Sequence, residues 1–217
     1  KTHVIRNLSI VDAAGEIFVP EIRVDLTGAG SLSIPKVEVN ELRPSHLYEV
    51  GKGRPAETKP FLIRQLTVSD VYGAPLSVEA LSGKGSFHFA NPVKKNLHNT
   101  IFKIPAEILS RIGIDLIALT PVTGHVFFDI SDGQVHLLKF KDVYSDGKLS
   151  KFYLSSDYPS TIDFDGQLNM HVKMKQYTLL FKLAELLTFH IEGTLAKPTY
   201  SLKKHGKEEI SFNETEN

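Results

Sequence analysis

The chain has 217 residues, no cysteine, and 25 Lys plus Arg against 25 Asp plus Glu. The balanced charge gives no electrostatic case for binding nucleic acid, which requires a basic face. The absence of cysteine excludes disulfides, thiolate catalysis and cysteine-ligated zinc. Apolar residues make up 41% of the chain, which is typical of a globular protein, and no apolar run approaches the ~20 residues of a membrane helix.

The first part of the chain alternates apolar and polar side chains with the period of a β-strand. Over residues 18–26 one face is predicted to carry Phe18, Pro20, Ile22, Val24 and Leu26, and the other Glu21, Arg23 and Asp25. Across Pro35 the apolar parity changes, from Leu32 and Ile34 to Val37 and Val39. A change of parity at a proline indicates a bulge or an edge break.

Residues 43–60 contain three prolines and two glycines and are predicted to be a loop. Strands are expected to follow over residues 61–71 and 76–89. Gly83 and Gly85 share the parity of the phenylalanines that follow them, so we expect a bend or a close backbone approach at these glycines.

The second half adds two short apolar helices, predicted over residues 106–112 and 179–187, to a further series of strands. Asp132-Gly133 is a two-residue turn signal. A hairpin closed by this turn pairs Ile130 with Val135 and Phe128 with Leu137, so the register and the turn chemistry agree.

The most informative segment is the stripe at residues 161–175, which alternates polar and apolar side chains throughout. At about 3.3 Å per residue one strand of this length spans roughly 50 Å. A three-residue turn over Asp165 to Gln167 is the alternative, because it pairs Phe164 with Leu168 and keeps the apolar faces matched. The unbroken or bulged strand is the preferred interpretation. The apolar face of the stripe comprises Ile162, Phe164, Gly166, Leu168, Met170, Val172 and Met174.

These patterns predict a mainly β protein with ten or more strands and two short helices. Two short helices cannot cover a sheet of that size. The sheet is therefore either curled into a long amphipathic groove, antiparallel or mixed, or one half of a β-sandwich. We expect three regions, which are a sheet segment and loop over residues 1–60, a β domain over residues 61–202, and a flexible polar tail over residues 203–217.

Enzyme chemistry finds weak support. Gly83 to Ser86 resembles the end of a phosphate loop but lacks the upstream glycine and lies in a strand pattern. Asp163 and Asp165 lie on one strand face, as a catalytic pair could, but on the side where solvated acids are expected. None of the nine histidines has metal-ligand spacing. We therefore expect no catalysis, metal or cofactor.

Three motifs follow one another in the second half of the chain. They are Thr123-Gly124-x-Val126-x-Phe128-x-Ile130-x-Asp132-Gly133-x-Val135, Gly166-x-Leu168-x-Met170-x-Val172, and Ile191-x-Gly193-Thr194-Leu195-Ala196-Lys197-Pro198. Together they resemble the C-terminal region of AsmA-like bacterial envelope proteins (the AsmA and TamB type), which end with a similar G-T-L-x-x-P strand after a short helix. The resemblance covers residues 121–202 well and residues 1–60 barely.

The resemblance implies a curled sheet, the β-taco, whose concave apolar face carries phospholipid acyl chains and contributes to outer-membrane lipid transport and biogenesis. It implies a periplasmic domain in the cell envelope, anchored to the inner membrane through a segment upstream of this chain, and no catalytic residues. The expected partner is a phospholipid or another acyl lipid. The alternative is a closed sandwich that serves as an interaction or adhesion module. The predicted lipid-binding residues are Ile162, Phe164, Leu168, Met170, Val172, Met174, Phe189 and Ile191.

Overall fold

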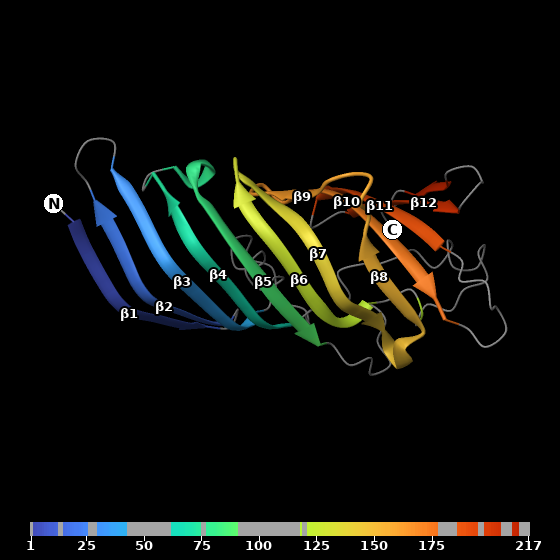
Figure 1. The fold of residues 1–217 in the computed structure, drawn as a ribbon, viewed down its shortest axis with the longest axis horizontal. Coiled ribbons are helices and arrows are strands. Elements are labelled where there is room, and N and C mark those ends of the chain that lie inside the picture. The colour runs from blue at the N-terminus through green and yellow to red at the C-terminus, as the bar shows by residue number, and fades with distance from the viewer. Residues whose placement is uncertain are drawn as a thin grey trace.

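The fold is a single β-sheet of thirteen strands in a computed structural model that describes residues 2–12, 15–25, 30–42, 62–74, 77–90, 118, 121–177, 186–194, 198–204 and 210–212 (Figure 1). The first seven strands are β1 Thr2–Asp12, β2 Gly15–Asp25, β3 Ser31–Leu42, β4 Ile63–Gly73, β5 Ser82–Ala90, β6 Pro121–Ser131 and β7 Gln134–Ser145. The others are β8 Ser150–Leu154, β9 Ser160–Asp163, β10 Gln167–Gln176, β11 Leu186–Thr194, β12 Pro198–Lys204 and β13 Ile210–Phe212. Single 3₁₀ turns occupy Val78–Ala80 (η1) and Asp146–Lys148 (η2).

The strands follow one another across the sheet almost in chain order, and every pair is antiparallel. β3 pairs with β4, so the sheet continues from one to the other, and the loop predicted at residues 43–60 lies outside the described residues. Figure 1 shows the strands side by side along the long axis, with the long strands β1 to β7 curved. The predicted mainly β class is confirmed. The alternative of two separate sheets is not found, because all thirteen described strands belong to one sheet.

β8 and β9 share one position in the sheet, between β7 and β10. Between them, residues 155–159 leave the ladder and return to it. Both ends of this excursion are held by one residue of β10. The Ser155 amide donates to the His171 carbonyl at 2.8 Å, and the His171 amide donates to Ser160 Oγ at 2.9 Å. The interruption is therefore a hydrogen-bonded feature of the sheet.

The hairpin predicted at Asp132-Gly133 is confirmed. Ile130 pairs with Val135 and Phe128 with Leu137. Asp132 and Gly133 have φ values of 53° and 73°, as a type I′ turn requires at both central positions.

The unbroken strand preferred over residues 161–175 is wrong, because the segment is a hairpin formed by β9 and β10. The turn spans residues 164–166, one residue earlier than the alternative placed it, so Ile162 and not Phe164 pairs with Leu168. The Asp163 carboxylate fixes the turn by accepting the Gln167 amide at 2.6 Å, and Gly166 has a φ of 82° that glycine adopts without strain. Period-two patterning cannot locate such a turn, because a three-residue loop preserves parity.

The parity change at Pro35 is confirmed, but it produces no slip in register. The pairing of β3 with β2 and with β4 keeps the same offset on both sides of the proline. The change extends across neighbouring strands. In β2 the change of apolar parity falls at Pro20, so the buried Val19 lies on the apolar face together with Ile22 and Val24. The single parity predicted for residues 18–26 is therefore wrong. The register does shift between β4 and β5, by one residue between Ser69 and Tyr72.

The predicted helix over 106–112 lies outside the described residues, as do residues 179–185 of the second one. Leu186 and Leu187, the last two residues of that second helix, instead begin β11. Ala118, described alone between β5 and β6, is helical and fully buried.

The buried apolar side chains form one large cluster over β5 to β12 and a smaller one over β3 and β4. The two are joined through Leu66 and Phe87, which pack against both. The clusters lie on a face of the sheet over which the described residues include no second sheet.

Candidate functional site

The candidate site is this apolar face, which extends across the sheet and not only along one strand. One row of directly opposed residues crosses seven strands, from β1 to β7. Its members are Ile10, Ile17, Val39, Leu66, Phe87, Val126 and Phe140. A second row crosses β5, β6, β7, β9, β10 and β11 and consists of Gly83, Ile130, Val135, Ile162, Leu168 and Gly193. We call the surface formed by these rows and the two buried clusters the apolar face.

Two glycines allow this face to pack closely. A Cβ on Gly85 would lie 2.5 Å from Phe128 Cζ and 2.6 Å from the Thr67 carbonyl oxygen, so the Phe128 ring occupies the space that a side chain would fill. A Cβ on Gly83 would lie 3.3 Å from Val71 Cγ2. The expected close backbone approach is confirmed at Gly85, whereas the atom nearest to a Cβ on Gly83 is a side-chain methyl group.

Seven of the eight predicted lipid-binding residues lie together on the apolar face. Ile162 and Leu168 form a cross-strand pair and are half-buried. The other five lie on β10 and β11 and are at most 5% exposed, with Met170 opposite Ile191 and Val172 opposite Phe189; Met174 is the fifth. Such burial is that of core residues, so these side chains do not line an open surface.

Phe164, the eighth predicted residue, lies elsewhere. It falls in the turn between β9 and β10 and is 40% exposed. Its amide donates to the Gly133 carbonyl at 3.0 Å, which fastens this turn to the turn between β6 and β7. The assignment of Phe164 to the apolar face depended on the unbroken strand, which the hairpin replaces.

The apolar face becomes more exposed toward β1. Ile10, the first member of the seven-strand row, is 47% exposed, and Ile5 on the same strand is 51% exposed. Sequence reasoning missed this end, although the short segment between Ile10 and Ile17 contains Asp12 and Gly15, which are common turn residues. The accessible part of the apolar face is therefore at the β1 end, far along the sheet from the predicted residues (Figure 1).

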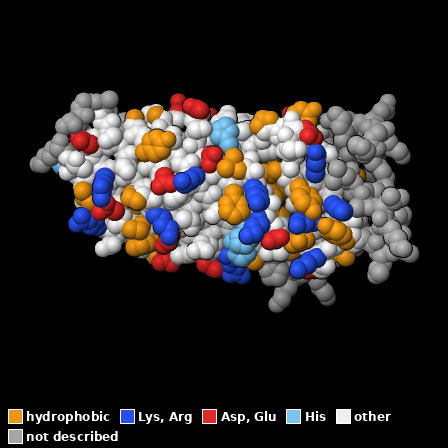
Figure 2. Space-filling model, viewed as in Figure 1, with side chains coloured by type: hydrophobic (Ala, Val, Ile, Leu, Met, Phe, Trp, Pro, Cys, Tyr) orange, Lys and Arg blue, Asp and Glu red, His pale blue; other side chains and the backbone are white. Residues whose placement is uncertain are grey.

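The opposite face is polar and carries ion pairs between neighbouring strands. In the view of Figure 2, basic and acidic side chains are interspersed along the sheet, and neither sign forms a large patch. Glu21 accepts hydrogen bonds from Arg23 at 2.6 Å and from Arg6 at 3.1 Å, and these bonds lower the pKa of its carboxyl group. Further pairs join Lys84 to Asp70 and Lys173 to Asp157.

A short stack of rings lies on the polar face, directly behind the buried part of β10 and β11. His171 stacks on His190 with ring centroids 4.1 Å apart, and Tyr158 stacks on His171 at 4.8 Å. Partial burial is the main cause that lowers the pKa of His171, and the neighbouring His190 lowers it further. Glu192, which lies 3.3 Å from His190, acts in the opposite direction.

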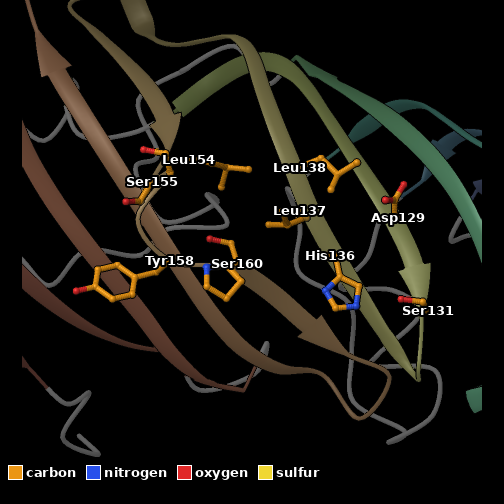
Figure 3. A pocket seen from close by; sticks show the side chains of 11 residues that line it. Asp129, Ser131, His136, Leu137, Leu138, Leu154, Ser155, Tyr158 and Ser160 are labelled. Atoms are coloured by element: carbon orange, nitrogen blue, oxygen red, sulfur yellow. The ribbon is translucent and has the colours of Figure 1, made fainter.

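A shallow hollow of about 530 Å³ opens where the β8–β9 strand is interrupted (Figure 3). Asp129, His136 and Tyr158 line its polar part. Leu137 and Leu154, which belong to or pack against the apolar cluster, line it from opposite sides of the gap (Figure 3). The hollow therefore borders both the polar surface and the apolar face.

The residues weighed for enzyme chemistry have structural positions. Gly83 to Ser86 lie within β5, where all four pair with β6 and the last three also pair with β4, so they do not form a phosphate-binding loop. Asp163 caps the β9–β10 turn and Asp165 is exposed within it. In the ranges that the structure describes, no three His, Asp or Glu side chains gather to hold a metal ion.

No family model, curated protein or solved structure matches this chain. The resemblance to AsmA-like proteins therefore stays a prediction based on the motifs of residues 121–202.

Proposed function

We propose that this chain is a non-enzymatic domain that binds the acyl chains of a phospholipid or a related lipid on its apolar face. The observation that carries the proposal is the uninterrupted apolar row from β1 to β7, on a single sheet with no second described sheet opposite it. A soluble domain whose sheet is apolar on one face needs something to cover that face. An acyl chain is a ligand of the required shape and chemistry.

The proposed mechanism involves no reaction. An acyl chain that lies across the strands removes apolar surface from water, which is worth about 25 cal/mol per Å². It enters where the face is most exposed, beside Ile5 and Ile10. The polar headgroup stays at the margin of the face, and the hollow at the strand interruption is one such margin, because it joins polar side chains to Leu137 and Leu154.

The proposed setting follows the AsmA-like resemblance and is part of the same proposal. The domain lies on the periplasmic side of a bacterial envelope, is held at the inner membrane by a segment outside this sequence, and guides lipid for outer-membrane biogenesis. In the part of the chain that the structure describes, no helix has the length and hydropathy of a membrane span.

A second candidate is an interaction module without a lipid ligand. The observation in its favour is the deep burial of Met170, Val172, Met174, Phe189 and Ile191, which leaves no open surface at that part of the face. Under the first function an acyl chain covers the half-buried residues around the core, and under the second function no lipid covers them.

The test compares two adjacent positions of β4 that point to opposite faces. Val68 is a half-buried member of the apolar face, and Thr67 lies on the polar face. The assay is transfer of a fluorescent phospholipid from phosphatidylethanolamine vesicles to the protein. We expect Val68→Asp to abolish capture of the lipid, because a carboxylate on the apolar face is costly to desolvate against an acyl chain, and Thr67→Asp to leave capture unchanged.

The control is the fold of each variant, followed by circular dichroism and urea unfolding. If Val68→Asp does not fold, Val68→Thr replaces it, because threonine has nearly the same shape and exchanges one methyl group for a hydroxyl group. Equal capture by a folded Val68 variant and the unchanged chain contradicts lipid binding on this face and favours the interaction module.

A further inference from the structure

The outer edge of β1 is a long strand edge with few of the features that normally protect one. β1 has eleven residues and, among the described strands, pairs only with β2. The opposite edge of the sheet is β13, which has three residues. Natural edge strands are commonly blunted by lysine, proline or short length. The sequence of β1, THVIRNLSIVD, contains neither lysine nor proline.

Large apolar side chains are exposed along this edge. Val4, Ile5 and Ile10 are 45–51% exposed and Val11 is 72% exposed. They lie on both faces of the sheet, so an acyl chain on the apolar face covers only some of them. A further strand paired with β1 would cover part of all four and would satisfy the unpaired backbone groups.

The order of faces along β1 is symmetric about the bond between Arg6 and Asn7. Pairing with β2 sets Ile5 opposite Ile22, Leu8 opposite Val19 and Ile10 opposite Ile17 on the apolar face. Arg6 lies on the polar face, where it bonds to Glu21. Asn7 has a φ of 53° and shifts the alternation by one residue, so Arg6 and Asn7 are two successive polar-face residues. Moving away from this pair in either direction along β1, successive residues lie on the apolar face, the polar face and the apolar face.

We propose that β1 pairs antiparallel with β1 of a second copy of this chain, with Arg6 opposite Asn7 of the second copy. In this register every residue faces one from the same side of the sheet. Ile5 lies opposite Leu8 and His3 opposite Ile10 on the apolar face, while Val4 lies opposite Ser9 and Thr2 opposite Val11 on the polar face. A two-fold axis relates the copies, and the apolar faces of the two sheets become continuous.

The pairing of β1 with β2 is the precedent for this arrangement. Their register is constant along the strand, although both strands change parity at the same level, at Asn7 in β1 and at Pro20 in β2. Two copies of β1 in the proposed register align their parity changes in the same way. A shift by one residue puts apolar residues opposite polar-face residues, and a shift by two sets Leu8 opposite Asn7.

The proposal does not depend on lipid binding and is tested by the oligomeric state of the full chain. Sedimentation over a range of concentrations is expected to show a dimer of the 24.2 kDa chain. Ile5→Lys is expected to weaken the dimer by about tenfold or more, because the interface would bury a charge. Tyr72→Lys is the matched control, since Tyr72 is as exposed as the edge residues but lies on β4, and it should leave the dimer unchanged.

Cysteine crosslinking tests the register, since the chain has no cysteine of its own. In the double variant Val4→Cys, Ser9→Cys, the cysteine at position 4 of each copy lies opposite the cysteine at position 9 of the other copy. This variant should give a disulfide-linked dimer under mild oxidation. The double variant Val4→Cys, Val11→Cys, which fits the register shifted by two residues, should crosslink poorly. A chain that stays monomeric at all concentrations overturns the proposal, as does a dimer that Ile5→Lys does not weaken or a stronger crosslink from the second variant.

Discussion

Replacement of Gly85 by alanine tests whether the apolar face is packed as closely as the structure indicates. The added Cβ would lie 2.5 Å from Phe128 Cζ and 2.6 Å from the Thr67 carbonyl oxygen. Both distances are roughly 1 Å shorter than an ordinary van der Waals contact. The ring and the backbone of β4 must therefore move, and overpacking of this kind costs about 1–3 kcal/mol.

A smaller gain opposes this cost, because alanine restricts the unfolded chain and stabilises by about 0.4–1 kcal/mol where the backbone tolerates it. We expect Gly85→Ala to lower the free energy of unfolding by about 1–2 kcal/mol, which corresponds to about 2–8 °C in Tm for a chain of this size. The matched control is Gly83→Ala on the same strand and face, where the closest atom is the side-chain methyl Val71 Cγ2 at 3.3 Å. The free energy of unfolding of this variant should lie within about 1 kcal/mol of that of the unchanged chain.

Urea unfolding followed by circular dichroism measures both variants, and an unchanged slope shows that only stability has altered. Phe128→Leu removes the ring atom closest to the new Cβ, so the cost of Gly85→Ala should be smaller in that background. Equal stability of the Gly85 and Gly83 variants would refute the close approach of Phe128 to β5, and with it the packing of the central apolar face.

Two further predictions concern the buried part of β10 and the polar face behind it. Met174→Ala should lower the free energy of unfolding by about 2–5 kcal/mol, since Met174 is fully buried, whereas Leu138→Ala at an exposed position should change it by less than about 0.5 kcal/mol; urea unfolding measures both. The lowered pKa of His171 means that the unfolded chain binds the proton more tightly than the folded chain, so stability should be complete above pH 6.5 and should fall as the pH drops through that value. His171→Gln should reduce this loss in urea titrations between pH 8 and pH 5, and an undiminished pH dependence would contradict the partial burial of His171 as its cause.

The sequence was sufficient to predict the fold class and much of the register. Alternation identified most of the strands, and Asp132-Gly133 placed the β6–β7 hairpin to the residue, because turn type and parity agree there. The motifs also brought Met170, Val172 and Ile191 together correctly on one face, since period two fixes which side of a strand a residue occupies.

Three features could not be predicted from pattern alone. The β9–β10 turn preserves parity, so alternation does not distinguish it from one long strand, and Phe164 was assigned to the wrong place. The parity change is visible in the sequence at Pro35 of β3, but its continuation into the neighbouring strands depends on the backbone conformation at residues such as Asn7 and Asp70, whose positive φ values the alternation does not reveal. Burial depends on the whole sheet, so the pattern could not indicate that Ile10 is exposed while Met174 is enclosed.

The central claim is that the apolar face holds acyl chains, and the most direct test is mass spectrometry of the lipids that accompany the protein. The chain is produced in a bacterial host, purified without detergent and examined intact and after solvent extraction. The account predicts bound phospholipid on the unchanged chain and on Thr67→Asp, and its loss from folded Val68→Asp. A chain that carries no lipid and takes up no fluorescent phospholipid from vesicles would contradict it.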